Sequence, residues 1–392
     1  MTQDTTRTTG LGPHTPTGLV LTALLAALAF VPTASAHSGT THAQTPHWLL
    51  LVLTVGGLTA VFGTAWAVRR GRLGTRFGLA GIGLGTLAGG FGGVGLVEMQ
   101  IVSTVAPQLL EWYPVFTLLA GTLVMTGSVV GGFLFWRTRP RYTALGIVLG
   151  AWILYPTLLP NEGTTNPLGY VVVLALPITI AYVLRQDAAG LVGDVFARRK
   201  TAAAGVFAAV FVVGFLSFSA GTLTVNPDWG PGGPTGQILA FLPVASPLVY
   251  WPAVEFVFPS VPLAGMLSVG TVLLFGTLAT LVGINASVMA TQWLASSGES
   301  SSTSMLGAVA TTGATACCCC APAMYGVLSA AFGAAASPLY WAFMDPSSPL
   351  GTLFLALSVT LLTVSIVRTA ESWSTPAVCD VDRSPVAGQT SD

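Results

Sequence analysis

Long apolar blocks alternate with short polar loops along most of this chain. Each block is roughly 17 to 25 residues long, which is the length that an α-helix needs to cross a hydrocarbon core about 30 Å thick. The pattern predicts an all-α fold, a polytopic transmembrane helical bundle that occupies residues 48–367. The predicted spans, about nine in number, are residues 48–68, 77–97, 114–136, 142–159, 168–184, 201–223, 263–291, 305–334 and 351–367.

The composition supports the membrane class and excludes several others. Of the 392 residues, 53% are hydrophobic and only 7% are charged, whereas about 25% of an ordinary soluble domain is charged. The formal net charge is zero, so the total predicts neither a nucleic-acid partner nor a polybasic tail. The lipid bilayer is therefore the expected partner of this surface.

The basic residues of the helical domain gather in a few of its loops. The basic positions, in chain order, are Arg69, Arg70, Arg72, Arg76, Arg137, Arg139, Arg141, Arg185, Arg198, Arg199, Lys200, Arg368 and Arg383. The loops between these clusters carry Glu and Asp but no Lys or Arg. Because basic residues resist translocation, we expect a multi-pass protein of the cell membrane whose basic loops are cytoplasmic. Residues 368–392 then form a cytoplasmic C-terminal tail, polar, short and disordered.

A proline-rich apolar stretch interrupts the series of spans at residues 237–262. It carries Pro243, Pro247, Pro252, Pro259 and Pro262. We interpret it as a re-entrant or interfacial segment, since a full crossing here would reverse the orientation of every later span. Irregular backbone is tolerated at membrane depth only where protein or a water-filled cavity covers it.

Glu255 lies within this stretch and has apolar neighbours on both sides. An acid held at membrane depth is a functional candidate by default. If the segment lies at the surface instead, Glu255 is only a hydrated carboxylate.

The amino terminus has the features of a secretory leader. Residues 1–36 contain an apolar stretch followed by Ala34, Ser35 and Ala36, the small-x-small pattern of a signal peptidase site. We expect a signal peptide, with an uncleaved signal anchor as the alternative. Cleavage would leave His37 at the start of an external segment, residues 37–47.

That external segment holds three histidines, His37, His42 and His47. Imidazole is a good ligand for copper, zinc or nickel, and a free amino-terminal His can bind copper through both its amine and its ring. Such a terminus resembles those of copper-binding periplasmic proteins and copper monooxygenases. The alternative interpretation is a solvated linker that happens to contain histidine.

The positions of His and Lys exclude other cofactors. No His falls within a predicted span, so no haem ligand pair is expected. Retinal needs a buried Lys, but the only Lys, Lys200, lies in a basic cluster. A P-loop for nucleotide is absent as well. We find no catalytic motif and expect a protein that is not an enzyme.

Four adjacent cysteines, Cys317, Cys318, Cys319 and Cys320, form the most unusual feature of the chain. They follow the start of the predicted span by 12 to 15 residues, which at about 1.5 Å per residue corresponds to mid-membrane depth. Pro322 comes two residues later and should kink or open the helix. Two or three thiols could then converge on a soft ion such as Cu(I).

The sequence leaves three interpretations of the cysteine run. Cys can serve as a small buried hydrophobe in a close-packed helix. It can bind a soft metal, which is the interpretation that leads to copper or another soft ion as cofactor or cargo. Thiol redox exchange is the third interpretation, although the run contains no spacing of the Cys-x-x-Cys kind.

A glycine row marks the second span. Gly81, Gly85, Gly89 and Gly93 recur at every fourth position and form a strip along one helix face. Such a strip permits close approach of another helix. The row is a candidate contact face within the chain or in a homo- or hetero-oligomer.

The leading functional hypothesis is a permease-like membrane protein that handles a soft metal ion. The alternatives are a non-catalytic subunit or assembly scaffold of a membrane complex, and a membrane thiol redox protein. These three hypotheses differ in whether Cys317–Cys320 binds metal, packs or exchanges disulfides.

Overall fold

The structure is a computed structural model of the whole chain. The residues that it describes are 47–98, 111–159, 163–225, 235–261, 263–295, 328, 333–344 and 348–374. The predicted leader, the eighth predicted span apart from residues 328, 333 and 334, and the predicted tail beyond residue 374 therefore lie outside the description.

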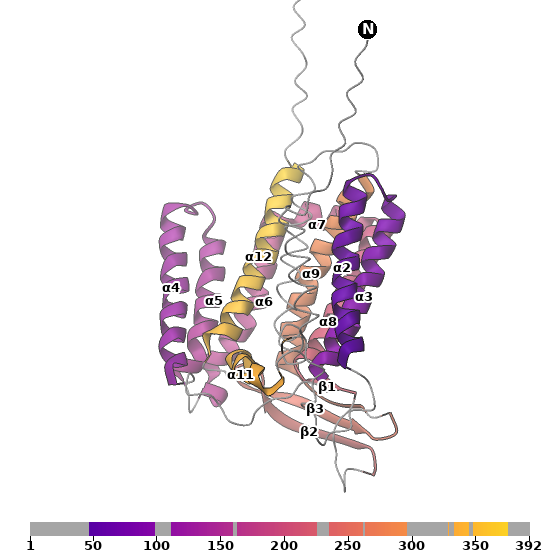
Figure 1. The fold of residues 1–392 in the computed structure, drawn as a ribbon. Coiled ribbons are helices and arrows are strands. Elements are labelled where there is room, and N and C mark those ends of the chain that lie inside the picture. The colour runs from indigo at the N-terminus through magenta and orange to yellow at the C-terminus, as the bar shows by residue number, and fades with distance from the viewer. Residues whose placement is uncertain are drawn as a thin grey trace, which may run out of the picture.

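Helices make up most of the described chain (Figure 1). The long helices are α2 (His47–Arg69), α3 (Thr75–Glu98), α4 (Tyr113–Leu134), α5 (Pro140–Leu158), α6 (Pro167–Asp187), α8 (Arg199–Ser219), α9 (Val269–Ala295) and α12 (Pro349–Ser374). The short ones are η2 (Gly163–Thr165), α7 (Ala189–Ala197), η3 (Gly333–Ala336) and α11 (Ser337–Met344).

By length and composition, seven helices in the described residues could cross a membrane: α2, α3, α4, α6, α8, α9 and α12. The predicted class of helical membrane protein is thereby confirmed. The predicted span at 142–159 also forms a helix, α5, but this 19-residue helix is not among the seven. It instead contributes one of the most buried surfaces in the molecule, including Leu149, Trp152 and Ile153.

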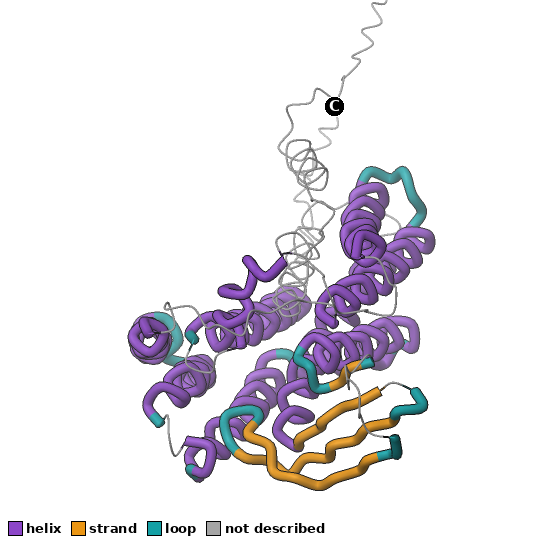
Figure 2. The backbone as a smooth tube through the Cα atoms, turned by 60° about the horizontal axis from the view of Figure 1, so that its bottom comes forward, coloured by secondary structure: helices purple, strands orange, loops and turns teal. Residues whose placement is uncertain are grey.

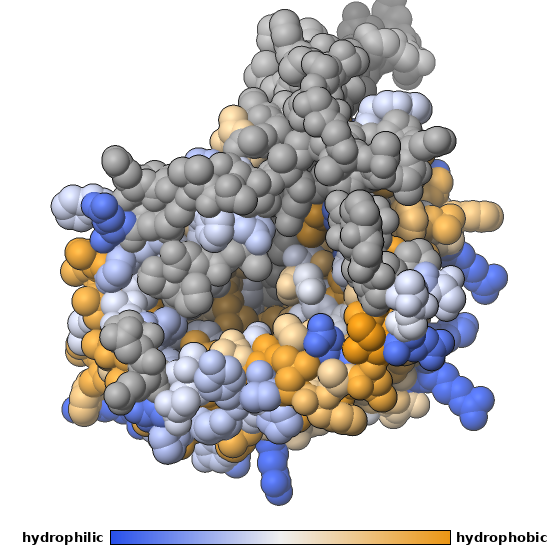
Figure 3. Space-filling model, turned by 90° about the horizontal axis from the view of Figure 1, so that it is seen from below, coloured by the Kyte–Doolittle hydropathy of each residue, from blue (hydrophilic) through white to orange (hydrophobic). Residues whose placement is uncertain are grey.

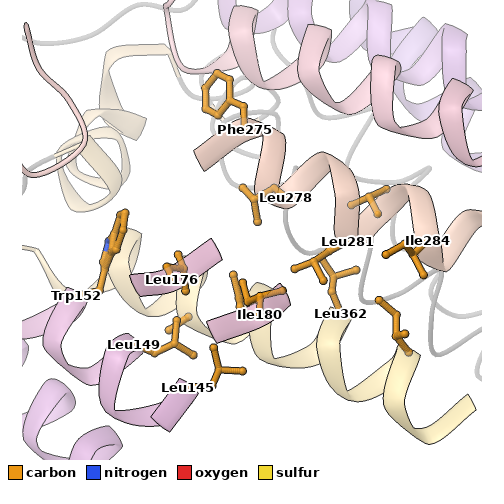
Figure 4. Packing of buried hydrophobic residues seen from close by; sticks show 14 of the residues in the cluster. Leu145, Leu149, Trp152, Leu176, Ile180, Phe275, Leu278, Leu281, Ile284 and Leu362 are labelled. Carbon is orange, nitrogen blue, oxygen red and sulfur yellow. The ribbon is translucent and has the colours of Figure 1, made fainter. Parts of the chain in front are cut away.

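The core lies where α5, α6, α9 and α12 meet (Figure 4). Leu145 and Leu149 of α5 lie beside Leu176 and Ile180 of α6, and the apolar face of α9 approaches from the other side. Leu281 of α9 is fully buried, like Leu362 of α12. Lipid tails are as apolar as these side chains, so close packing rather than hydrophobicity selects this arrangement.

The predicted glycine row packs against α2 of the same chain. A Cβ atom added to Gly85 would lie 2.8 Å from the carbonyl oxygen of Gly57, and one added to Gly81 would lie 2.6 Å from Cγ2 of Thr64. Gly89 also faces the backbone of α2 at Gly57, and Gly93 is buried. The row therefore serves as a contact face within the chain, which is the first of its two predicted uses.

A four-stranded antiparallel sheet replaces the predicted re-entrant or interfacial segment. Its strands are β1 (Leu223–Thr224), β2 (Ile238–Ala245), β3 (Tyr250–Phe258) and β4 (Leu263–Ser268), in the order β1-β4-β3-β2. Figure 2 shows the strands side by side along one edge of the molecule, beyond the helices. The prediction of an all-α fold was therefore wrong for this segment, and the predicted span at 263–291 begins six residues later, at Val269.

The prolines fit the sheet because of where they fall in it. Pro243 of β2 lies directly opposite Pro252 of β3. Neither residue has an N–H group, so the two form a pair that exchanges no ladder hydrogen bonds, a position antiparallel strands provide at every second residue. Pro247 lies in the connection between the two strands, and Pro259 lies in the turn after β3.

The two ends of the bundle differ in charge. The α2–α3 turn, the α4–α5 turn, α7 and the last turn of α12 lie together at the upper end in Figure 1. The basic clusters identified in the sequence lie in these elements or next to them: Arg69–Arg76 and Arg137–Arg141 in the two turns, Arg198–Lys200 directly after α7, and Arg368 near the end of α12. The sheet and α11 lie at the opposite, lower end. We call these the basic end and the sheet end.

Two ion pairs join helices at the basic end. Arg141 binds the carboxylate of Asp187 through two nitrogens, and Tyr142 donates to the same carboxylate at 2.9 Å. Arg139 binds Glu371 of α12. Hydrogen bonds to Glu371 and then to Tyr142 raise the pKa of the Arg139 guanidinium, which therefore stays charged at every physiological pH.

The contact between α2 and α3 predicts that alanine substitutions at two glycines of α2 will have very different effects on stability. In Gly57→Ala, the new Cβ atom would lie 2.2 Å from the backbone nitrogen of Gly89, so the helices must separate. We expect the free energy of unfolding to fall by about 1 to 3 kcal/mol. Thermal unfolding of the purified protein in detergent measures this loss. In the control, Gly63→Ala, nothing lies within 4 Å of the new atom, and stability should be unchanged or slightly higher. Equal midpoints for the two variants would contradict this packing.

Removal of an arginine should lower the free energy of unfolding by different amounts in the two ion pairs. The side chain of Asp187 is only 8% exposed, so Arg141→Gln leaves a carboxylate without its cation and should cost roughly 3 kcal/mol. The double variant Arg141→Gln/Asp187→Asn should recover most of that loss. Arg139→Gln disrupts a pair in which each side chain is about 40% exposed. This substitution should cost no more than about 1 kcal/mol. Chemical unfolding in detergent measures all three variants.

Candidate functional site

Most residues of the predicted metal site lie outside the described residues. These are Cys317, Cys318, Cys319, Cys320, Pro322, His37 and His42. His47 is the first residue of α2, and it begins that helix at the sheet end. The structure describes elements that precede and follow the cysteine run in sequence.

The flanking elements of the cysteine run lie at opposite ends of the bundle. Helix α9 starts directly after β4 at the sheet end and reaches Ala295 at the basic end. The described chain resumes with η3 and α11 at the sheet end, before α12 returns to the basic end. The chain between α9 and η3 therefore connects one end of the bundle to the other.

Helix α9 is the most deeply buried of the seven candidate spans, because 56% of its apolar stretch is buried inside the protein. It packs against α8, α6 and α12. Several of its buried side chains are polar, among them Asn285, Ser287 and Thr291, each at most 2% exposed. A polar group inside a membrane bundle is costly unless it has a partner or a function.

Asn285 links α9 to α12. Its Nδ2 atom donates to the carbonyl oxygen of Leu281 at 2.9 Å and to that of Leu362 on α12 at 3.2 Å. Hydrogen bonds between membrane helices contribute about 0.6 kcal/mol on average. The bond fixes the rotation of α9 against α12 more than it adds stability.

Four other buried hydroxyls have no hydrogen-bond partner among the described residues: Thr157 on α5, Ser287 on α9, and Ser358 and Thr363 on α12. Thr291, by contrast, donates to the carbonyl of Ser287 one turn earlier in the same helix, the usual arrangement for a buried helical hydroxyl. The two helices that precede and follow the cysteine segment thus carry unused donors in the bundle interior.

At the sheet end, polar contacts fix the sheet to the helices. The hydroxyl of Ser268 in β4 donates to the carbonyl of Ser246 at 2.7 Å and is hydrogen-bonded to Thr271 of α9. Tyr170 of α6 donates to the carbonyl of Tyr250, and its ring packs edge-on against Trp251 at 4.9 Å. The sheet is therefore held by α6 and α9.

Two acids of this end, Glu98 and Glu255, have different surroundings. Glu98, the last residue of α3, accepts a hydrogen bond from the Thr224 hydroxyl at 2.5 Å, which ties β1 to that helix. Glu255 lies in the middle of β3, between Ala240 and Met266 on the neighbouring strands, and is half-buried. Its position in the sheet, outside all candidate spans, fits the alternative of a surface carboxylate rather than an acid at membrane depth.

An apolar groove of about 580 Å³ runs between α4 and α12. Its lining comes from Tyr113, Phe116, Leu119, Ala120, Leu123, Pro349, Leu350 and Leu353. Both helices are candidate spans, so the groove faces the hydrocarbon of the bilayer. No Asp, Glu, His, Lys or Arg lines it, and apart from the Tyr113 hydroxyl its lining side chains are apolar.

Sequence reasoning missed the residues that join the sheet to the bundle and those that join α9 to α12. The alternation of buried Trp251, Ala253 and Val257 with more exposed neighbours is the period-two signal of a strand. The hydropathy of the sequence does not show this alternation, because the residues between the buried ones are also apolar apart from Glu255. No local signal marks Asn285, because its partner is a carbonyl 77 residues away.

Within the described residues, no three His, Cys, Asp or Glu side chains lie close enough to hold a metal ion. A metal hypothesis therefore depends on the cysteine run itself. Searches of the chain against models of protein families, against curated proteins and against solved structures found no match.

Proposed function

We propose that this protein is a permease-like membrane protein that handles a soft metal ion, with Cu(I) as the prototype. The observation that carries the proposal is the run of four adjacent cysteines followed by Pro322. Thiolates are soft ligands, and Cu(I) accepts two or three of them.

The chemistry of the run suits a site of low coordination number. Consecutive residues of a straight helix turn by about 100°, so only Cys317 and Cys320 would share a face. A proline at position 322 has no N–H group for the carbonyl of Cys318, so a helix opens there and lets further thiols turn inward. Structural zinc sites space their cysteines by at least two residues, which argues against zinc.

The described helices support a site inside the membrane. The elements that precede and follow the cysteine segment lie at opposite ends of the bundle. Helix α9, which leads into that segment, is the most buried of the candidate spans and carries Asn285 and Ser287 in its interior face. Polar groups in the interior of the bundle are what passage of an ion would require.

For orientation, we propose that the basic end faces the cytoplasm and the sheet end faces outward. The Arg-rich turns between α2 and α3 and between α4 and α5 lie at the same end as α7 and the last turn of α12. Short basic loops stay on the cytoplasmic side of the cell membrane. In this orientation His47 lies at the outer surface, with the external histidines His37 and His42 before it to collect the ion.

A second candidate function is that of a non-catalytic subunit of a membrane complex. The sheet end favours it, because the edge strand β2 exposes Leu239 by 65% and Phe241 by 80%. Seen from this end, hydrophobic residues are exposed beside hydrophilic ones (Figure 3). A partner with an apolar surface or strand would cover them.

The proposed metal site predicts that copper depends on the cysteine run. Replacement of Cys317, Cys318, Cys319 and Cys320 by Ser should abolish stoichiometric copper in protein purified from copper-supplemented cells, as measured by elemental analysis. Serine is nearly the same size as cysteine and can bond the carbonyl one turn back, so the variant should still fold. Pro322→Ala should reduce the copper content, because the helix can close there.

The matched control is Cys379→Ser, which removes the one cysteine outside the run and should leave the copper content unchanged. Equal copper in the wild type and the quadruple variant would mean that the run only fills space. The subunit hypothesis would then be the better one, and co-purifying proteins would test it.

The proposed orientation predicts which end an impermeant thiol reagent can reach. Thr164 lies in η2 at the sheet end, and Ala189 begins α7 at the basic end. In intact cells the reagent should label Thr164→Cys and not Ala189→Cys, with the wild type as background. After permeabilisation both should react. Labelling of Ala189→Cys alone in intact cells would reverse the orientation.

A further inference from the structure

Two arginines of the α2–α3 turn lie against one tryptophan. The guanidinium carbon of Arg70 lies 4.8 Å from the ring centre of Trp66, and that of Arg72 lies 5.2 Å from the same ring. Both arginines are exposed, and so is Trp66, by 42%. The turn thus holds two positive charges on one indole at the surface.

Backbone geometry produces this arrangement. Gly71 has a positive φ of 66°, its N–H group donates to the carbonyl of Val68, and the N–H of Arg72 donates to that of Ala67. These bonds form a Schellman motif, which ends α2 and reverses the chain. The reversal puts Arg70 before Gly71 and Arg72 after it, and both reach back over Trp66.

Within the part of the chain that the structure describes, the charges in this turn are not neutralised. In the α4–α5 turn, Arg139 and Arg141 are paired with Glu371 and Asp187. Among the described residues, no carboxylate forms an ion pair with Arg70 or Arg72. Two like charges gathered on one ring repel each other, so an external anion between them would relieve a real electrostatic cost.

The turn lies at the level of lipid headgroups. It joins α2 to α3, both candidate spans, at Arg69 and Thr75. Trp66 on one side and Phe77 on the other, exposed by 42% and 75%, provide apolar contacts at the membrane boundary. A soluble anion would gain nothing from contact with these rings, whereas a lipid would pack its glycerol and upper acyl chains on them.

We propose that the α2–α3 turn is a binding site for the phosphate headgroup of an anionic phospholipid. Arg70 and Arg72 would each donate to phosphate oxygens, since guanidinium groups match the geometry of phosphate. Trp66 holds both groups in place, and so reduces the ordering cost of binding.

Lipid retention measured by native mass spectrometry tests the site. The wild type, released from nanodiscs of equal parts phosphatidylglycerol and phosphatidylcholine, should retain phosphatidylglycerol in preference. Arg70→Gln/Arg72→Gln should lower that retention on the order of tenfold. The control Arg137→Gln/Arg199→Gln removes two exposed charges at the same end and should change it little.

Gly71→Ala gives a second, charge-neutral test. Alanine disfavours a positive φ, so the turn must rearrange and Arg72 should leave the Trp66 ring. Retention of phosphatidylglycerol should fall although both arginines are present.

Three results would overturn the proposal. The first is unchanged retention in Arg70→Gln/Arg72→Gln. The second is an equal loss in the control pair, which would mean a general charge effect. The third is displacement of the lipid by inorganic phosphate but not by chloride at the same ionic strength, which would indicate a site for a soluble phosphate.

Discussion

Water is absent from the hydrocarbon core, so backbone N–H and C=O groups there must be hydrogen-bonded within the protein. This constraint divides the described chain into two kinds of structure. The candidate spans are helices, which satisfy their own backbone. The one extended segment, β2 to β4, lies at the sheet end, where its edge strand can meet water or a partner. Pro243 and Pro252 lie opposite each other at a pair that forms no hydrogen bonds between the strands, so they fit an antiparallel sheet. In the interior of a membrane helix, each would remove a backbone hydrogen bond.

Because helices surrounded by lipid gain little from hydrophobic burial, contact geometry decides how they pair. Gly57 meets Gly85 and Gly89 at backbone distance, and Gly205 meets Gly283 in the same way where α8 packs on α9. The two pairs use small residues at a close crossing, as expected for membrane helices. Polar groups have the complementary role: Asn285 sets the rotation of α9 against α12 through a single bond.

The sequence predicted what depends on local composition and failed where contacts are distant. Span lengths and positions followed from apolar runs, and the glycine row indicated a close helix contact without naming α2 as its partner. The sheet was missed because an apolar, proline-rich run reads alike whether it enters the bilayer or pairs as strands. Strand β4 also runs directly into α9, so hydropathy alone gave no boundary at Val269. For the candidate metal site, the thiols were evident in the sequence. The burial of the Ser358 and Thr363 hydroxyls on α12 was not, because it depends on how the helices pack.

The arginines show the same difference between local composition, which the sequence reveals, and distant contacts, which it does not. In sequence, the α2–α3 and α4–α5 turns are equivalent clusters, and the positive-inside rule treats them alike. In the structure, Arg141 is hydrogen-bonded to Asp187, 46 residues away in the chain. Among the described residues, Arg70 and Arg72 instead lie over the ring of Trp66 and form no ion pair. Positive charge at the basic end therefore has two separate roles. One part joins α5, α6 and α12 through the Arg139 and Arg141 ion pairs. The other part, Arg70 and Arg72, is exposed at the surface, where we propose that an anionic phospholipid binds.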